Sequence, residues 1–139
     1  MFACYDAFVG MRLGAPPTTD FSMAARTLAF DIRRLAWSDE VLAAAGVDPG
    51  RLPPVVPAGT PIGEVDAETA ARLGFRGRPL VVAGGHDQPC GALGVGAAGP
   101  GRAAFAIGTT ACVTPVLRLD ELGTHPVHAG SQPIVASSR

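Results

Sequence analysis

The run Gly-Gly-His-Asp-Gln at residues 84–88 carries the strongest chemical signal in the chain. It follows the apolar run 80–83, which is typical of a strand buried on both faces. The glycine pair permits close backbone approach, so His86, Asp87 and Gln88 can project into a cleft at the carboxyl end of that strand. Strand ends of this kind are a common place for chemistry. The alternative is that Asp87 only caps a helix that starts near Gln88.

A second candidate site is the triplet Gly108, Thr109 and Thr110, flanked by the apolar runs 103–107 and 111–117. This pattern predicts a β-hairpin with a glycine-containing turn. Backbone amides freed by the glycine, together with two hydroxyl donors, can form an anion-binding concavity that holds phosphate without a cation. A plain hairpin turn is the alternative.

Two other motifs predict no site. Residues 94–99 match G-x-G-x-x-G, but a predicted helix precedes them and Pro100 and Gly101 follow, which is the wrong context for dinucleotide binding. His125 and His128 have a spacing found in metal sites, but Pro126 and the nearby glycines oppose a helix, so solvated loop histidines are expected.

The three cysteines, Cys4, Cys90 and Cys112, are an odd number without a short spacing. This favours reduced, mostly buried thiols over a disulfide framework or a zinc site.

The first half of the chain is expected to supply helices around the strand at residues 80–83. Residues 2–13 have near-helical apolar spacing and stop at Gly14. Because this pattern opens without a cap, the chain looks cut from something longer. Residues 21–30 predict a second helix. Its N-cap oxygens come from Thr18, Thr19 or Asp20.

Further elements follow from local signals. Ser38 is expected to cap a short helix closed by Gly46, and Asp66 to cap another over residues 67–73 that ends at Gly74. Five prolines predict an extended surface connection over residues 47–61, and not a core strand. Residues 62–65 predict a short strand.

Composition places the chain among ordinary soluble proteins. It has 139 residues, a net charge of -1 and 47% hydrophobic residues, so it is expected to bury one core. No basic field points to nucleic acid. No run reaches the roughly 20 apolar residues of a membrane span. The N-terminus has no basic segment typical of a signal peptide, so a cytoplasmic location without membrane partners is expected.

The ordered series of motifs resembles the FGGY family of carbohydrate kinases. Besides the run beginning at Gly84 and the Gly-Thr-Thr hairpin, the resemblance covers nearly everything from Met1 to about Leu117. Its other parts are Thr-Asp-Phe-Ser-Met-Ala-Ala-Arg-Thr at 19–27, Trp-Ser-Asp-Glu at 37–40, Leu-Pro-Pro-Val-Val at 52–56 and Gly-Thr-Pro-Ile-Gly at 59–63.

The resemblance implies an α/β fold of the ribonuclease H-like, actin and sugar-kinase type, in which two domains close around a cleft. Residues 1–99 would be the last portion of the first domain, and residues 100–139 would open the second with a β-hairpin. Members are much longer than this chain. The first phosphate loop, most sugar-binding residues and the adenine site would lie outside it, so the isolated chain is expected to be inactive.

The resemblance also implies roles for site residues. Asp87 would be the general base that takes the proton of the attacking sugar hydroxyl. Gln88 and His86 would contact the sugar or polyol, and Gly108, Thr109 and Thr110 would hold the phosphates of ATP. Mg²⁺ would bridge phosphate oxygens, with no metal ligand in this chain.

Two hypotheses from different classes follow. The first is a fragment of an ATP-dependent carbohydrate kinase whose chemistry depends on Asp87. The second is an inert remnant that acts as an interaction or regulatory module. A homo-oligomer is compatible with the full-length protein, and the sequence does not identify the sugar or polyol.

Overall fold

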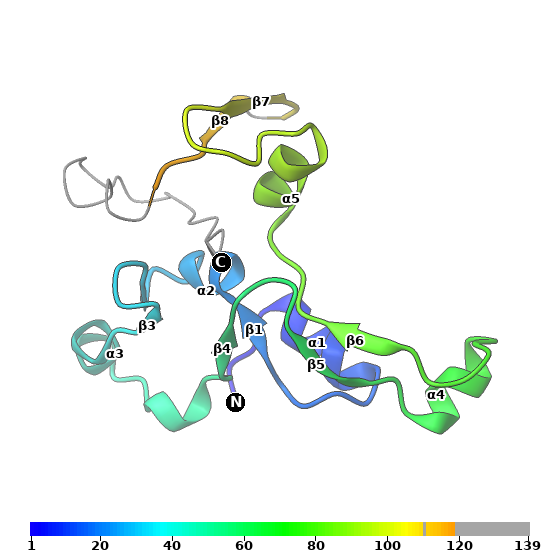
Figure 1. Cartoon of the computed structure of the whole chain (residues 1–139). Coiled ribbons are helices and arrows are strands. Elements are labelled where there is room, and N and C mark those ends of the chain that lie inside the picture. The colour runs from blue at the N-terminus through cyan, green and yellow to red at the C-terminus, as the bar shows by residue number, and fades with distance from the viewer. Residues whose placement is uncertain (110, 119–139) are drawn as a thin grey trace.

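The computed structural model describes residues 1–109 and 111–118 (Figure 1). Thr110 and the histidines His125 and His128 lie outside these described residues. Within them the chain is mixed α/β, and its strands form four two-stranded sheets. None of the helices in this part is long and apolar enough to cross a membrane.

The elements are short and alternate irregularly along the chain. In order they are α1 (Tyr5–Arg12), β1 (Thr19–Asp20), α2 (Phe21–Ala25), β2 (Phe30–Asp31), β3 (Ala36–Trp37), α3 (Asp39–Ala45), the 3₁₀ turn η1 (Pro49–Arg51), β4 (Val55–Val56), β5 (Pro61–Glu64), α4 (Ala67–Arg72), β6 (Leu80–Val82), α5 (Asp87–Gly94), β7 (Ala103–Ile107) and β8 (Ala111–Pro115).

Three of the sheets are antiparallel and one is parallel. β1 pairs with β4 in parallel, whereas β2 with β3, β5 with β6 and β7 with β8 are antiparallel. In Figure 1, α5 and the β7–β8 hairpin lie together at one end of the molecule, away from β5 and α4. The hairpin at 103–107 and 111–115 agrees with the sequence prediction.

The first helix is shorter than predicted. The Phe2 amide donates to the Arg51 carbonyl at 2.7 Å, which holds the first residues extended, so α1 begins at Tyr5 and not at residue 2. Its end near Gly14 agrees with the prediction.

The second helix is also shorter than predicted, because α2 ends at Ala25 instead of near Phe30. The Thr27 hydroxyl donates to the Ala24 carbonyl and accepts from the Ala29 amide, competing with helical hydrogen bonds. Leu28 then adopts a left-handed conformation, with φ +62°. The chain turns there, and Phe30 pairs with Trp37 in β2–β3.

The proline-rich connection at residues 47–61 contains a two-residue strand, β4, where the prolines predict an extended surface connection and not a core strand. Val55 and Val56 keep their amides between flanking prolines and pair in parallel with Thr19 and Asp20, which are buried. Two consecutive residues with N–H groups are therefore enough for pairing inside an otherwise proline-broken segment.

Local capping signals predicted the other helix boundaries well. The Ser38 hydroxyl accepts from the Val41 amide and the Asp66 carboxylate from the Thr69 amide, as expected for N-caps. Gly46 ends α3 with φ +65°, a left-handed conformation that favours glycine. These contacts lie within one or two helical turns, so the sequence shows them directly.

The prediction that residues 80–83 are buried on both faces is wrong for the described part of the chain. β6 pairs with β5 alone, and Leu80 is 63% exposed. Only Ala83, just after the strand, is buried. An apolar run shows that a strand has side chains suited to burial on both faces, but not that both faces are covered. Within the described residues, β5 is the strand that pairs with β6.

Candidate functional site

The loop between β6 and α5 carries the predicted catalytic run. Its start is fixed by Ala83, whose carbonyl accepts from the Gly59 amide at 2.7 Å and whose amide donates to the Thr60 carbonyl at 2.8 Å. The loop then passes through two glycines to His86, which occupies the N-cap position of α5. Asp87 is thus placed on the first turn of a helix at the carboxyl end of a strand.

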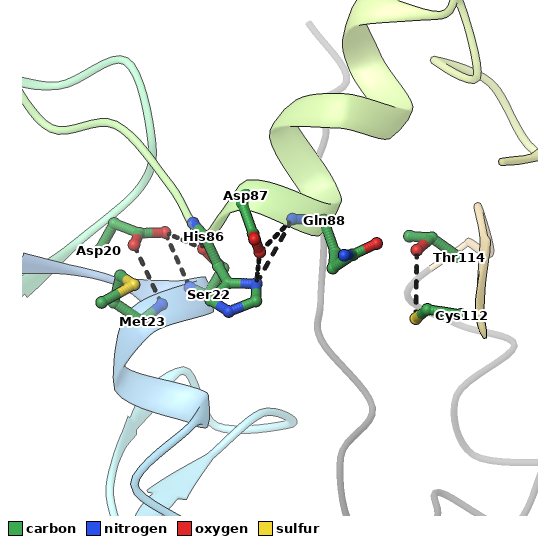
Figure 2. Close-up of polar contacts among 8 residues, drawn as sticks. All are labelled: Asp20, Ser22, Met23, His86, Asp87, Gln88, Cys112 and Thr114. Atoms are coloured by element: carbon green, nitrogen blue, oxygen red, sulfur yellow. Dashed lines mark hydrogen bonds and ion pairs between the residues drawn. The ribbon is translucent and has the colours of Figure 1, made fainter. Parts of the chain in front are cut away.

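The Asp87 carboxylate is exposed, at 78% of its side-chain surface, and is held through one oxygen (Figure 2). Oδ1 accepts the Gln88 amide hydrogen at 2.7 Å and lies 2.9 Å from His86 Nδ1. Among the described residues, Oδ2 has no hydrogen-bond partner. The carboxylate is therefore oriented through one oxygen and leaves the other open.

The ring of His86 must donate to Asp87. Two acceptors 2.9 Å apart would repel each other, so Nδ1 carries a proton that points at the carboxylate. The same atom cannot then accept the Gln88 amide, which lies 3.4 Å away and has the shorter contact to Asp87. The His86 side chain is only 22% exposed, which helps to keep the ring in this orientation.

The capping alternative for Asp87 holds in part. Its carboxylate does receive one amide of the first turn, but Asp87 is the first residue of α5 and not its cap. The geometry fits both a contact to the first turn of α5 and a chemical role for Asp87, because the amide contact uses Oδ1 alone.

The backbone of this loop is tied to α2 by polar side chains that the sequence analysis did not place at the site. The His86 amide donates to the Ser22 hydroxyl at 2.8 Å, and that hydroxyl donates to Asp20 Oδ2 at 2.8 Å (Figure 2). Both residues lie in the run 19–27 that resembles the FGGY family, and Asp20 is also one of the predicted N-cap candidates. No local pattern places either of them at this loop, because His86, the partner of Ser22, lies 64 positions away in the sequence.

The polar contacts of Asp20 and Ser22 continue to Asp6 on α1. Asp6 Oδ2 accepts from the Thr19 hydroxyl at 2.7 Å and from the Asp20 amide at 3.1 Å. Burial, followed by the negative charges of Asp6 and Asp20, raises the pKa of the nearby Cys4 thiol. Cys4 is therefore held as a neutral thiol beside these carboxylates.

The predicted substrate-contact residue Gln88 follows Asp87 on α5. Its side chain points away from the Asp87 carboxylate in Figure 2. His86 and Asp87 are brought into contact with each other, whereas the Gln88 side chain is turned in another direction. Only the backbone amide of Gln88 joins the hydrogen bonds of the loop.

The second candidate site is carried by the β7–β8 hairpin. Its ladder closes with Ile107 opposite Ala111, so Gly108 and Thr109 form part of the turn between the strands, and both are exposed. A small apolar cluster of Ala92, Ala97 and Val116 joins this hairpin to α5. The helix that begins with Asp87 therefore also packs against the hairpin that carries the turn.

The free thiols differ in exposure. Cys4, Cys90 and Cys112 form no disulfide, which agrees with the predicted reduced state. However, Cys90 is exposed and the other two are half-buried, so the prediction of mostly buried thiols is wrong. Cys90 lies on the short helix α5, where few residues are covered.

The described residues do not by themselves make a Mg²⁺ site. They contain no group of three or more His, Cys, Asp or Glu side chains placed to hold a metal ion. The Gly108 turn offers donors, which suit phosphate oxygens and not a cation.

The arrangement of elements matches that of sugar kinases in solved structures. The ligand-bound xylulose kinase from Lactobacillus acidophilus superimposes with a TM-score of 0.71 at 25% identity, covering 78% of this chain and 22% of that one. A kinase from Brucella ovis, described as a xyloylose kinase, gives a TM-score of 0.67 at 30% identity, covering 74% and 22%. The fold is that of one part of a sugar kinase.

The sequence comparison identifies the family. The model of the FGGY family of carbohydrate kinases, N-terminal domain, matches residues 1–94, and the chain belongs to this family. It is 32% identical over 106 residues to the xylulose kinase of Bacillus subtilis (strain 168), covering 76% of this chain and 21% of that one. It is 33% identical over 107 residues to the gluconokinase of Bacillus licheniformis, covering 75% and 21%. The chain thus spans about a fifth of the length of these relatives.

Proposed function

We propose that this chain supplies the general base and one phosphate-holding turn of an ATP-dependent kinase that phosphorylates a hydroxyl of a sugar or polyol. The observation that carries the proposal is the Asp87 carboxylate, oriented through Oδ1 and open at Oδ2. Family membership supports the reaction class. The Gly108 turn supports the placement of phosphates at the hairpin.

In the proposed reaction, Oδ2 of Asp87 accepts the proton of the substrate hydroxyl as its oxygen attacks the γ-phosphorus of ATP. The new oxygen–phosphorus bond forms while the bond to the bridging β–γ oxygen breaks, and ADP leaves. Such a transition state depends mainly on positioning and on charge stabilisation. His86 and the Gln88 amide orient the base, and amides of the Gly108 turn, with the hydroxyls of Thr109 and Thr110, hold phosphate oxygens.

Residues 1–99 would then belong to the first domain of the kinase, and residues 100–139 would begin the second. In this arrangement α5 lies just before the boundary, and its contact with Val116 joins the two parts. The family resemblance implies that His86 and Gln88 contact the sugar or polyol, and Mg²⁺ would be held mainly by ATP and by residues outside the described part.

The test uses a full-length kinase that carries this segment, either as the native reading frame with its flanking sequence or as a chimera with the Bacillus subtilis xylulose kinase. ADP formation is measured with a panel of ketoses, aldoses and polyols. Asp87→Asn is expected to lower kcat by about 10²- to 10⁴-fold. Asp39→Asn is the matched control, because Asp39 is also the exposed first residue of a helix, and it should leave kcat unchanged.

The proposal fails if Asp87→Asn retains the activity of the parent kinase. The 139-residue chain alone is expected to form no ADP with any member of the panel, and turnover by it would contradict the assignment of only part of the active site to this chain.

A further inference from the structure

Ser22 makes the polar contact that joins α2 to the loop before Asp87. It is the second residue of α2 and is only 3% exposed. Its hydroxyl donates to Asp20 Oδ2 and accepts from the His86 amide, both at 2.8 Å. A hydroxyl has one proton, and the carboxylate can only accept, so the Ser22 lone pair is directed to the His86 amide.

Asp20 fixes the direction of this hydroxyl. Its carboxylate is 2% exposed and accepts from the amides of Ser22 and Met23 as well as from the Ser22 hydroxyl. Its own amide donates to Asp6. With each oxygen bound, the carboxylate has little freedom to turn, so the Ser22 hydroxyl has one favourable orientation.

Gly85 shows that the loop is packed closely against the same hydroxyl. A Cβ atom at Gly85 would lie 3.3 Å from Ser22 Oγ and 3.2 Å from Cys90 Sγ, closer than most side chains tolerate. At the neighbouring Gly84, a Cβ atom would meet nothing within 4 Å. The loop is therefore held by a hydrogen bond at residue 86 and by close contact at residue 85.

We infer that Ser22 is a positioning residue for Asp87, holding the loop through the His86 amide so that the carboxylate meets the substrate hydroxyl at the right distance. This inference rests on the proposed function. The anchor lies one residue before the base, and the His86 ring contacts the base directly. A displacement of about 1 Å at a reacting group can lower the rate by about 10²-fold.

The test combines Ser22→Ala with Asp87→Asn in the full-length kinase. Ser22→Ala is expected to lower kcat about 10- to 100-fold and to leave KM for ATP within about twofold. In the Asp87→Asn background, the same Ser22→Ala change should lower kcat by less than about twofold, because the group that it positions is gone. A general loss of structure would lower kcat equally in both backgrounds.

Two controls separate positioning from stability. Thr69→Val removes another buried hydroxyl, on α4, and should leave kcat within about twofold. Gly85→Ala keeps the Ser22 hydroxyl but crowds it, and should lower kcat as Ser22→Ala does, whereas Gly84→Ala should not. Gly85→Ala thus provides a second route to the answer if Ser22→Ala does not fold.

Amide hydrogen exchange of His86 in the 139-residue chain gives a readout independent of activity. Exchange should be faster in Ser22→Ala than in Thr69→Val. Unchanged His86 exchange, an unchanged kcat in folded Ser22→Ala, or equal losses in both backgrounds would overturn the inference. If instead Asp87→Asn is fully active, the proposed function fails, while faster His86 exchange would still establish the anchor.

Discussion

The loop at residues 84–86 and the turn that begins at Gly108 both connect a strand to the next element, but their surroundings differ. The first lies against the buried polar side chains of Ser22 on α2 and of Asp20, the N-cap of that helix, both of which are almost fully covered. The second belongs to a hairpin whose Phe105 is 63% exposed. The hairpin is shaped by its own ladder and by a small apolar contact with α5.

This difference indicates two ways to position a reactive segment. A loop without regular structure needs hydrogen bonds from elsewhere in the fold, and the buried Ser22 hydroxyl, oriented by Asp20, supplies one to the His86 amide. A hairpin turn has its geometry set by five consecutive strand pairs, from Ala103–Pro115 to Ile107–Ala111, and needs less external support. Changes behind the loop should therefore disturb it more than comparable changes on the hairpin face.

The largest expected contrast compares two phenylalanines in two-stranded sheets. Phe30 is 7% exposed and packs on Phe21 and Trp37, with ring centroids 5.6 and 5.9 Å apart. Phe30→Ala should lower the free energy of unfolding of the chain by about 3 kcal/mol. Phe105→Ala should change it by less than about 0.5 kcal/mol. Urea denaturation measures the free energy of unfolding of both variants. Equal losses in the two would show that the hairpin face is packed as firmly as the region around Phe30.

The next contrast concerns two adjacent glycines. Gly85→Ala should lower the free energy of unfolding by roughly 1–2 kcal/mol, since the new methyl group crowds Ser22 and Cys90. Gly84→Ala meets open space and should leave stability unchanged or raise it by up to about 1 kcal/mol. Urea denaturation measures the free energy of unfolding of both variants. An unchanged value for Gly85→Ala would mean that the loop is not packed against α2.

On the hairpin, a substitution in the turn is expected to change activity without changing the stability of the chain. Gly108 has open space for a Cβ atom, so Gly108→Ala should change the free energy of unfolding by less than about 0.5 kcal/mol. If the turn holds phosphate by close backbone approach, the methyl group should raise KM for ATP about tenfold in the full-length kinase. Gly99→Ala, also in open space but outside the turn, is the control. An unchanged KM would remove the turn from the phosphate site.

The same contrast explains how far the sequence alone could go. The hairpin, the caps Ser38 and Asp66, and the position of Asp87 after a strand all follow from neighbouring residues. The Ser22–His86 contact does not, because no local pattern signals a partner 64 positions away. The parallel pairing of β1 with β4 is likewise not indicated by the sequence, because two-residue strands show no hydrophobic periodicity. The proline spacing also disfavours a strand in this segment.

The smallest effect compares two helix caps by their response to pH. The Thr69 amide, followed by the Thr69 hydroxyl, lowers the pKa of Asp66 below its ordinary value. The stability that this carboxylate adds is thus present above the ordinary aspartate pKa and is lost as pH falls through the lower folded pKa. The difference in Tm between the parent chain and Asp66→Ala should shrink as the solution is acidified through that range.

Ser38→Ala removes a cap that does not titrate, and its cost of about 1 kcal/mol should not follow the same decline. Thermal unfolding of the parent chain and both variants across the acidic range tests the pair. Because Asp66 acts within its own helix, its loss should leave His86 exchange unchanged at every pH. A Tm difference for Asp66→Ala that grows on acidification would contradict the predicted pH dependence. Faster His86 exchange in Asp66→Ala would mean that α4 and the buried contacts of Asp20 and Ser22 unfold as one unit, so that the loop has no separate anchor.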